Sequence, residues 1–509
     1  MLYYIYEMLN PHYYRRLLKM GKFNTRGAQT HAVPNTVNVA GGAAYKITDG
    51  RKELASVVLS SMLNGDQYYE NDADRQARIF ELIKQIEDKE FAAKAMIYTR
   101  QEGNLRSVSH LMANALVEAA SGSAYLRSAI KKAIVRPDDM TEMAALWFSR
   151  HPNKMLPNSM RRAFKDLLDA GKWDAYQLKK YIGNKKSVKL RDIIKITHPI
   201  DPRGLYKGVI ENTIQAPATI EKMLAGGQKA SQSFAVLLSE NKLGYMAAVK
   251  NIRNALETGI SDEALDQWCA MISDRRRVMK SRMLPFRFYD AWEAVRNLSV
   301  DQFKLRKVKA AFNQALIHSA ENLDMFNQGD KVALLLDESG SMGGVWKHAI
   351  ILAAVLYHAL GRENVVVYKF ANDASLANFG SDLPIDIIEK TPHYGGATYF
   401  SAPMKELIRT RTKVDKLIVL TDMQLYQTGG WSHYGNSETF DVYLKQYRAV
   451  SPQVMTLFWD LQGYGNATPL ELKDNILLAS GFSDKLLSVI PKMWKNENAL
   501  IQEIDSITL

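Results

Sequence analysis

KVALLLDESGSM, residues 331–342, decides the architecture of the second part of this 509-residue chain. Its first half, 331–336, is a continuous apolar run, which predicts a β-strand buried on both faces. Its second half places one carboxylate and two hydroxyls, on Asp337, Ser339 and Ser341, two residues apart in a glycine-containing loop. The stretch therefore predicts a strand that ends in a cluster of oxygen ligands suited to a hard cation.

The residues beyond this loop alternate between helical and strand-like runs. We expect helices over 345–360 and 401–409, and strands over 364–370, 416–420, 453–459 and 475–479. Apolar strands separated by helices are typical of a parallel sheet covered on both faces, so residues 326–509 are predicted to form a doubly wound α/β domain. Ligands in such sheets bind at the carboxyl ends of the strands, which is where the 337–341 loop begins.

Two further oxygen-bearing side chains follow later elements of this domain. Thr398 follows a Gly-Gly-Ala segment, and Asp422 follows the strand predicted at 416–420. With Asp337, Ser339 and Ser341 they form the pattern of a metal-ion-dependent adhesion site, and here the sequence resembles the von Willebrand factor A-like family from about residue 328 to the end. The resemblance implies Mg²⁺ or Mn²⁺, with an acidic group of a partner completing the coordination.

The simpler explanation is that Asp337 and the serines only cap the helix that follows. Such capping is common, but it does not require Thr398 and Asp422 at the ends of distant elements. A hydrolase built on Ser341 is the remaining catalytic alternative, although Ser339 stands where a nucleophile elbow needs glycine. We find no phosphate-binding Walker loop and no H-E-x-x-H, so we expect a protein without enzymatic activity.

The preceding part of the chain has a different pattern. Residues 21–49 look irregular, and from Arg51 to about Ala320 apolar residues recur at spacings of three and four, which predicts roughly fifteen helices without intervening strands. Stacked antiparallel helix pairs, an α-solenoid, are the expected architecture. Asp72, Asp138 and Ser261 occupy predicted N-cap positions. The clearest helical segments are 53–63, 75–86, 90–99, 107–120 and 160–168.

Charge divides the chain in the same place. The formal net charge is +12 overall; residues 326–509 hold 16 Lys and Arg against 20 Asp and Glu, and residues 1–325 hold 50 against 34. A basic body is the electrostatic footprint of a polyanion-binding protein, although a solvated basic surface explains the charge equally well.

The cysteine content and the hydropathy of the sequence bear on the cellular compartment of the protein. Cys269 is the single cysteine, so no intramolecular disulfide can form, which fits the cytoplasm. No apolar run is long enough to span a membrane. Basic residues follow the apolar part of residues 1–19 and no cleavage site is visible, so a secretory signal is not expected, and Met20 is an alternative start. Residues 1–34 are therefore treated as an N-terminal extension.

Three stretches in this order, 35–45 (NTVNVAGGAAY), 99–110 (TRQEGNLRSVSH) and 185–199 (KKSVKLRDIIKITHP), resemble the TROVE module of Ro proteins. That resemblance covers residues 35–325 and, with the A-type domain, nearly the whole chain. It implies a monomeric ring of HEAT-like helical repeats closed by the A-type domain. It also implies RNA quality control: a central hole takes single-stranded 3′ ends of misfolded or unprocessed RNAs. A small structured Y-like RNA binds the basic outer face and can tether an exoribonuclease.

The resemblance places RNA contacts of the outer face on Lys180, Lys185 or Lys186, Arg191 and His198. Lys189, Arg191 and Lys195 would form a basic stripe on a helix over 187–196, for which a solvated helix face is the simpler explanation. An isolated histidine before proline, as at His198, is more often a capping or packing residue.

Arg100, Arg106 and His110 are weaker candidates for the wall of the central hole. Arg106 and His110 are four residues apart and share a helix face, so a structural role between adjacent helix pairs explains them equally well. The sequence therefore favours an RNA-binding ring protein. The alternative is a metal-dependent protein-interaction scaffold that does not bind RNA.

Overall fold

The computed structural model describes residues 35–509 except 62–69, 183–185, 202, 216–228, 321–328, 425–439, 465–466, 473–474 and 482–483. Thr36–Leu509 forms one compact unit. Within the described ranges, no helix combines the length and the apolar character that crossing a bilayer requires.

The first part of the chain is helical, as predicted. The five clearest predicted helices appear with ends shifted by at most three residues, because apolar spacing fixes a helix better than its termini. The helices are α3 (Gly50–Ser60), α4 (Asp72–Gln85), α5 (Lys89–Gln101), α6 (Arg106–Ala119), α7 (Leu126–Ala133), α8 (Pro137–Arg150), α9 (Asn158–Asp169), α10 (Ala175–Lys180), α11 (Leu190–Thr197), α12 (Leu205–Ile210), α14 (Ala230–Ser239), α15 (Tyr245–Glu257), α16 (Asp262–Ser273), α17 (Arg275–Ser281), α18 (Pro285–Val295) and α19 (Gln302–Ala320).

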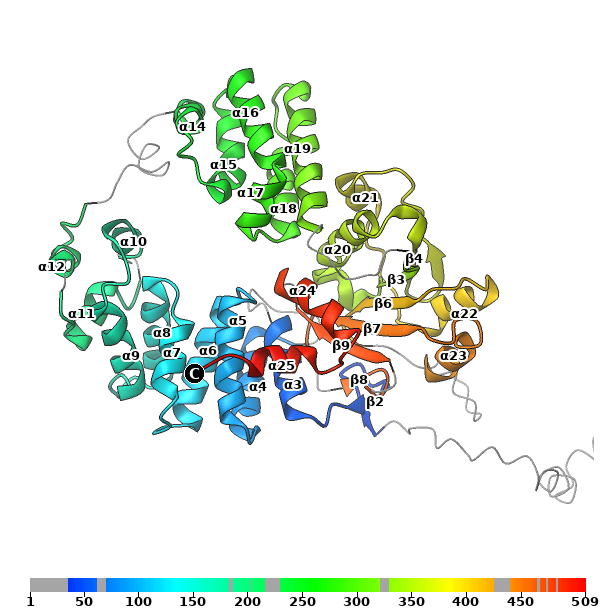
Figure 1. Cartoon of the computed structure of the whole chain (residues 1–509), viewed down its shortest axis with the longest axis horizontal. Coiled ribbons are helices and arrows are strands. Elements are labelled where there is room, and N and C mark those ends of the chain that lie inside the picture. Colours follow the sequence, from blue (N-terminus) through cyan, green and yellow to red (C-terminus); the bar gives the residue numbers. More distant parts are fainter. Residues whose placement is uncertain are drawn as a thin grey trace, which may run out of the picture. The chain divides into compact units, whose positions relative to one another are not determined.

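Neighbouring helices pack as stacked pairs. From α4 to α7, each helix packs against the helix two positions further along, and α8 and α9 both pack against α11. The helices α14 to α19 form a second packed group. Figure 1 shows the two groups, in blue to cyan and in green. This repetitive side-by-side packing is the α-solenoid architecture expected from the sequence.

The predicted helix caps are confirmed at one of three positions. The Ser261 hydroxyl accepts from the Ala264 amide and caps α16. The prediction is wrong for Asp72, because Asn71 caps α4 and Asp72 is its first residue. It is also wrong for Asp138, because Pro137 takes the first position of α8 and moves Asp138 inside the helix.

Two short strands precede the helices, where we expected irregular chain. The strand β1 (Thr36–Val37) pairs with β2 (Ala43–Lys46), and β2 pairs antiparallel with β8 (Ala467–Thr468), far along the sequence. Because the partner of β2 lies more than 400 residues away, local pattern could not reveal this pairing.

The second part is the doubly wound sheet predicted from the sequence. Its strand order is β5-β4-β3-β6-β7-β9, with every pair parallel except β4 and β5. The predicted strand ends agree to within two residues, and α22 begins and ends where predicted. The strands are β3 (Val332–Asp337), β4 (Val365–Phe370), β5 (Ala374–Leu376), β6 (Lys416–Thr421), β7 (Met455–Asp460) and β9 (Ile476–Ser480), and the helices are α20 (Trp346–Ala359), α21 (Pro384–Lys390), α22 (Ser401–Arg409), α23 (Phe440–Tyr447), α24 (Asp484–Met493) and α25 (Ala499–Asp505).

Successive side chains of β3 point to opposite faces of this sheet and pack in different hydrophobic clusters. Leu334 and Leu336 join the hydrophobic cluster that contains α20 and α21, whereas Ala333 and Leu335 join the cluster that contains α22 and α23. All six residues of β3 are buried, as a central strand covered on both sides requires.

The sheet contacts the first helices of the array. The helix α3 packs against β9, and α25 packs against α5. A Cβ added to Gly481 would lie 2.2 Å from the Leu59 carbonyl oxygen, so only glycine admits this approach.

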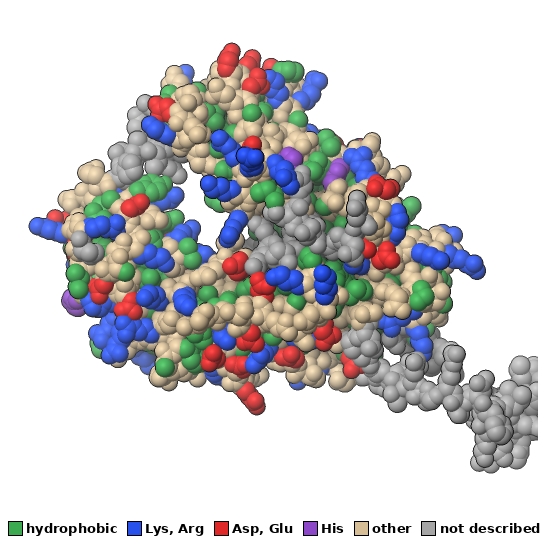
Figure 2. Space-filling model, viewed as in Figure 1, with side chains coloured by type: hydrophobic (Ala, Val, Ile, Leu, Met, Phe, Trp, Pro, Cys, Tyr) green, Lys and Arg blue, Asp and Glu red, His purple; other side chains and the backbone are tan. Residues whose placement is uncertain are grey.

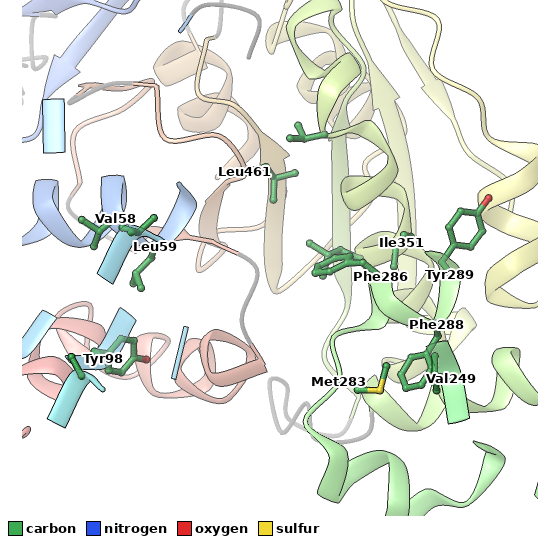
Figure 3. Close-up of a cluster of buried hydrophobic side chains, with 14 of the residues drawn as sticks. Val58, Leu59, Tyr98, Val249, Met283, Phe286, Phe288, Tyr289, Ile351 and Leu461 are labelled. Carbon is green, nitrogen blue, oxygen red and sulfur yellow. The ribbon is translucent and has the colours of Figure 1, made fainter. Parts of the chain in front are cut away.

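The helices that cover one face of the sheet contact the last helices of the array. The Asn313 side chain in α19 accepts from the Ile385 amide at 2.9 Å, and Lys309 pairs with Asp386 at 2.7 Å. Figure 3 shows apolar side chains from both groups of helices in one cluster with residues of the sheet region, including Ile351 and Leu461.

Candidate functional site

The predicted metal ligands meet at the carboxyl edge of the sheet. Asp337 ends β3, and Asp422 follows the adjacent parallel strand β6. The Asp337 carboxylate accepts from the Ser339 amide at 3.0 Å and from the Thr421 hydroxyl at 2.7 Å. The Ser339 and Ser341 hydroxyl oxygens lie 3.2 Å apart. Strand pairing therefore converts two sequence-distant segments into one cluster of oxygen atoms.

Thr398 is brought to the same edge by a glycine loop. The Gly340 amide donates to the Gly396 carbonyl at 2.9 Å, which holds the loop before Thr398 against the 337–341 loop. Gly396 has a φ of +130°, a conformation that other residues rarely adopt. All five predicted ligands are at most 4% exposed.

Negative charges lie close together at this edge. Burial, and then the charge of Asp337, raise the pKa of Asp422 to about 8, against a weaker opposing hydrogen bond from Ser341. The Oδ2 atom of Asp422 is buried and has no hydrogen-bond partner among the described groups. Two adjacent buried carboxylates are stabilised by a cation, so these residues fit a divalent metal ion. Among the described residues, no group of three Asp, Glu, His or Cys side chains could hold a metal ion by itself, so an ion at this edge would also need hydroxyl oxygens as ligands.

A third carboxylate at this edge was missed in the sequence. Asp460 ends β7, is buried, and accepts from the amides of Gln462 and Gly463 at 2.9 and 2.7 Å. Burial raises the pKa of Asp460 as well. The Gln462 side chain donates to the Ser341 carbonyl at 2.9 Å. A carboxylate directly after an apolar strand was the available sequence signal.

The predicted outer RNA contacts begin with an aromatic and basic surface on α10. The Lys180 ammonium lies 5.5 Å from the ring centre of Tyr176 and 5.8 Å from that of Tyr181. The guanidinium of Arg136 lies 5.1 Å from the Tyr181 ring centre. We call Tyr176, Lys180, Tyr181 and Arg136 the α10 surface. Lys185 lies outside the described residues.

Lys186 is held by acidic side chains. Its ammonium lies 2.7 Å from Glu142 and 3.7 Å from Asp138, both in α8. Arg106 also pairs with these two carboxylates, at 3.0 and 2.7 Å. A residue assigned to the outer face and one assigned to the central hole thus share the same acidic partners.

Arg191 lies on a different element, α11, and His198 directly follows that helix. Arg191 is exposed and 3.6 Å from Asp192. His198 ends the helix in a left-handed conformation with a φ of +45°, and its carbonyl accepts from Lys165 at 2.8 Å. Lys189 precedes α11, so the predicted stripe is shortened to Arg191 and Lys195.

Arg100, Arg106 and His110 converge on one buried carboxylate. Asp139 accepts from Arg100 at 2.9 Å and from Arg106 at 2.7 Å, and lies 3.2 Å from the His110 imidazole. Although burial raises its pKa, hydrogen bonding by His110 and the charge of Arg100 hold the pKa of Asp139 well below its usual range. These contacts bridge α5, α6 and α8, which is the structural role weighed for these residues.

Arg100 and Arg106 also line a cavity of about 840 Å³, together with residues of α15, α17 and α18. Its lining contains seven basic side chains and one acidic side chain, Asp290. Figure 2 shows Lys and Arg side chains around the hollow in this face. The basic lining residues are Arg100, Arg106, Arg136, Lys250, Arg253, Arg282 and Arg287. Five of them, Arg136 and the four from Lys250 onward, were missed because they are spread over separate segments and form no motif.

The chain thus combines a helical array with an α/β sheet that carries the ligand pattern of a metal-ion-dependent adhesion site. A family model of the TROVE domain matches residues 43–215 and 211–337, more than half of the chain, so the chain belongs to the TROVE domain family. Among solved structures, the crystal structure of the Ro (Rsr) protein of Deinococcus radiodurans matches with a TM-score of 0.55 and 14% identity, over 87% of this chain and 99% of that one. At that identity the likeness concerns the fold. No curated protein sequence matches the chain.

Proposed function

We propose that this chain is an RNA-binding protein of the Ro type, whose basic cavity accepts single-stranded RNA. The observation that carries the proposal is the composition of the cavity lining, which holds seven cationic side chains and one anionic side chain. Five of the seven cations pair with carboxylates, which leaves two for a ligand. Lys250 and Arg282 are exposed and have no ion-pair partner among the described residues, so they are available to phosphate groups. A protein that neutralises several phosphates gains affinity by releasing counterions.

Aromatic side chains beside the cavity supply the second requirement for binding single strands. Arg136 lines the cavity and also lies over Tyr181, so the α10 surface continues from the cavity wall. Bases stack on aromatic rings whatever their sequence, whereas structured RNA is contacted mainly through phosphates and hydroxyls. We assign single-stranded 3′ ends of misfolded RNAs to the cavity and the adjoining rings Tyr176 and Tyr181. We assign a small structured Y-like RNA to Lys180, Lys186, Arg191 and His198. An exoribonuclease tethered by the structured RNA completes this proposal.

The carboxyl edge of the sheet is proposed as a site for Mg²⁺. Asp337, Ser339, Ser341, Thr398 and Asp422 would hold the ion. Its two positive charges would compensate the buried carboxylates, and it would present an open position to an acidic or phosphate oxygen.

The cavity assignment is tested by RNA binding measured as fluorescence anisotropy. The probe is a labelled single-stranded oligouridylate, and the comparison is a blunt duplex of the same length. We expect the single strand to bind more tightly and its affinity to fall steeply between 50 and 200 mM salt, by roughly a hundredfold or more if about five phosphates are contacted. The double variant Lys250→Ala/Arg282→Ala should weaken binding and flatten this dependence.

The matched control replaces two exposed basic residues far along the chain, Lys390 and Arg409, which pair with acidic neighbours in the sheet region. This control removes the same net charge. Equal losses in both double variants, or a salt-independent affinity, would contradict an RNA site in the cavity.

A further inference from the structure

One carboxylate sits between two cations at the place where the cavity meets the predicted RNA surface. The Oε1 atom of Glu142 lies 3.0 Å from the Arg106 guanidinium and 2.7 Å from the Lys186 ammonium. Arg106 lines the cavity, and Lys186 belongs to the predicted outer RNA contacts. A single oxygen atom therefore bridges the two groups of residues that RNA would contact.

Glu142 differs from the other acidic groups of α8 in its exposure. Asp139 has a side-chain exposure of 0% and Asp138 of 7%, whereas Glu142 and Lys186 are 33% and 39% exposed. Asp139 is therefore an internal anchor that solvent and RNA cannot reach. Glu142 and Lys186 form the accessible part of the same network.

The charge of Glu142 is permanent under physiological conditions. Although burial raises its pKa, hydrogen bonds from His110 and Lys186 and the charge of Arg106 lower the pKa of Glu142 to about 2. An anionic oxygen shared by guanidinium and ammonium groups reproduces the way these cations bind a phosphate oxygen. Lys250 and Arg282, elsewhere in the cavity lining, lack any such internal partner among the described residues.

We propose that Glu142 occupies the position of an RNA phosphate between Arg106 and Lys186, and that it is a specificity-determining residue which bound RNA must displace. The inference rests on the proposed RNA-binding function. An RNA that contacts only this part of the surface gains little, because it exchanges one anionic partner of the two cations for another. An RNA that also reaches Lys250 and Arg282 gains enough to bind. Because of Glu142, a ligand of the cavity must therefore make contacts beyond Arg106 and Lys186 in order to bind.

The test compares Glu142→Gln with the wild type, using a labelled single-stranded oligouridylate in anisotropy titrations at several salt concentrations. The amide keeps the size of the side chain and removes its charge. We expect affinity to rise about three- to tenfold at low salt, and the slope of log affinity against log salt to steepen by roughly 0.7 for one additional neutralised phosphate. Melting temperatures show that the variant is folded, since Arg106 retains Asp138 and Asp139.

The charge-matched control is Glu406→Gln, which breaks an exposed pair with Arg409 on α22 and changes net charge equally. A double-mutant cycle supplies the second measurement. Lys186→Ala should cost more RNA affinity in the Glu142→Gln background than in the wild type, where Glu142 already engages the lysine.

Each outcome is decisive. A gain confined to Glu142→Gln, with the expected sign of coupling to Lys186, supports the proposal. Unchanged or weakened binding in Glu142→Gln, or an equal gain in Glu406→Gln, overturns it while leaving the RNA-binding function intact. Absence of RNA binding by the wild type overturns both.

Discussion

Replacement of Asp139 by alanine should destabilise the helical array more than any other single change to its charged residues. The carboxylate accepts from Arg100 and Arg106 and also from the amides of Val135 and Arg136 at 2.9 Å, so it joins the start of α8 to α5 and α6. Alanine would leave the side chain of Arg100, which is 8% exposed, without a charged partner.

The expected loss of folding free energy follows from these contacts. Breaking a buried ion pair by removing one partner costs about 3–5 kcal/mol. Two helix-start amides lose their acceptor, which adds roughly 1 kcal/mol each where water cannot replace it. Arg106 keeps Asp138 and Glu142, which reduces the loss. We expect a total of about 4 kcal/mol for Asp139→Ala, and less for Asp139→Asn, because the amide oxygen still accepts from the backbone.

Hydrogen exchange measures this loss locally. Opening of α8 should become about a thousandfold more frequent, read as lost protection of amides in peptides covering 135–150. The control is Asp166→Ala, which removes another aspartate–arginine pair between helices, with Arg127 48% exposed. That change should cost less than about 1 kcal/mol. A loss for Asp139→Ala as small as that of the control would refute the assigned role of the buried network.

Three other predictions concern the sheet interface, the metal site and acid stability. Gly481→Ala should lower the melting temperature far more than Gly259→Ala. Both glycines have a positive φ, but only a Cβ at position 481 would clash with the Leu59 carbonyl. Similar decreases in melting temperature would argue against the close packing of α3 on β9. Mg²⁺ at a hundredfold excess over its dissociation constant should stabilise the wild type by about 2.7 kcal/mol, which is measured as a rise in melting temperature. Asp422→Asn should abolish this rise. A rise that persists in the variant would place the ion elsewhere. Because the pKa of Glu142 is lowered to about 2, its contribution to stability is complete above the unfolded-state pKa of about 4.3 and is lost as pH falls toward 2. Glu142→Gln should therefore make the melting temperature depend less on pH in that range. An unchanged pH profile would disprove the ion pairing of Glu142.

The sequence predicted those parts of the fold and site that depend on local pattern. Apolar runs such as 331–336 identify strands, and the carboxyl ends of parallel strands lie at one edge, so the sequence alone places Asp337 and Asp422 together. Asp460 satisfies the same rule, but it lies outside the five-ligand pattern of the A-type family. The division of the chain into domains at about residue 325 stays a prediction.

Features set by contacts between distant segments could not be predicted. The β2–β8 pair and the close approach of Gly481 to α3 join segments more than 400 residues apart. The cavity cations Lys250 and Arg282 come from separate segments, since Lys250 lies in α15 and Arg282 directly follows α17. Lys186 was assigned by resemblance to an outer face, and only side-chain geometry shows that it shares Glu142 with Arg106 of the cavity.

The most direct test of RNA binding in the cavity is photocrosslinking of a 4-thiouridine-substituted single-stranded RNA to the full chain, followed by mass spectrometry of the crosslinked peptides. We predict crosslinks in peptides that cover 245–257 and 281–287, accompanied by Tyr181 of the α10 surface, and their loss in Lys250→Ala/Arg282→Ala. Crosslinks confined to residues 332–509, or no crosslinks above the level of a non-binding control protein, would contradict the account.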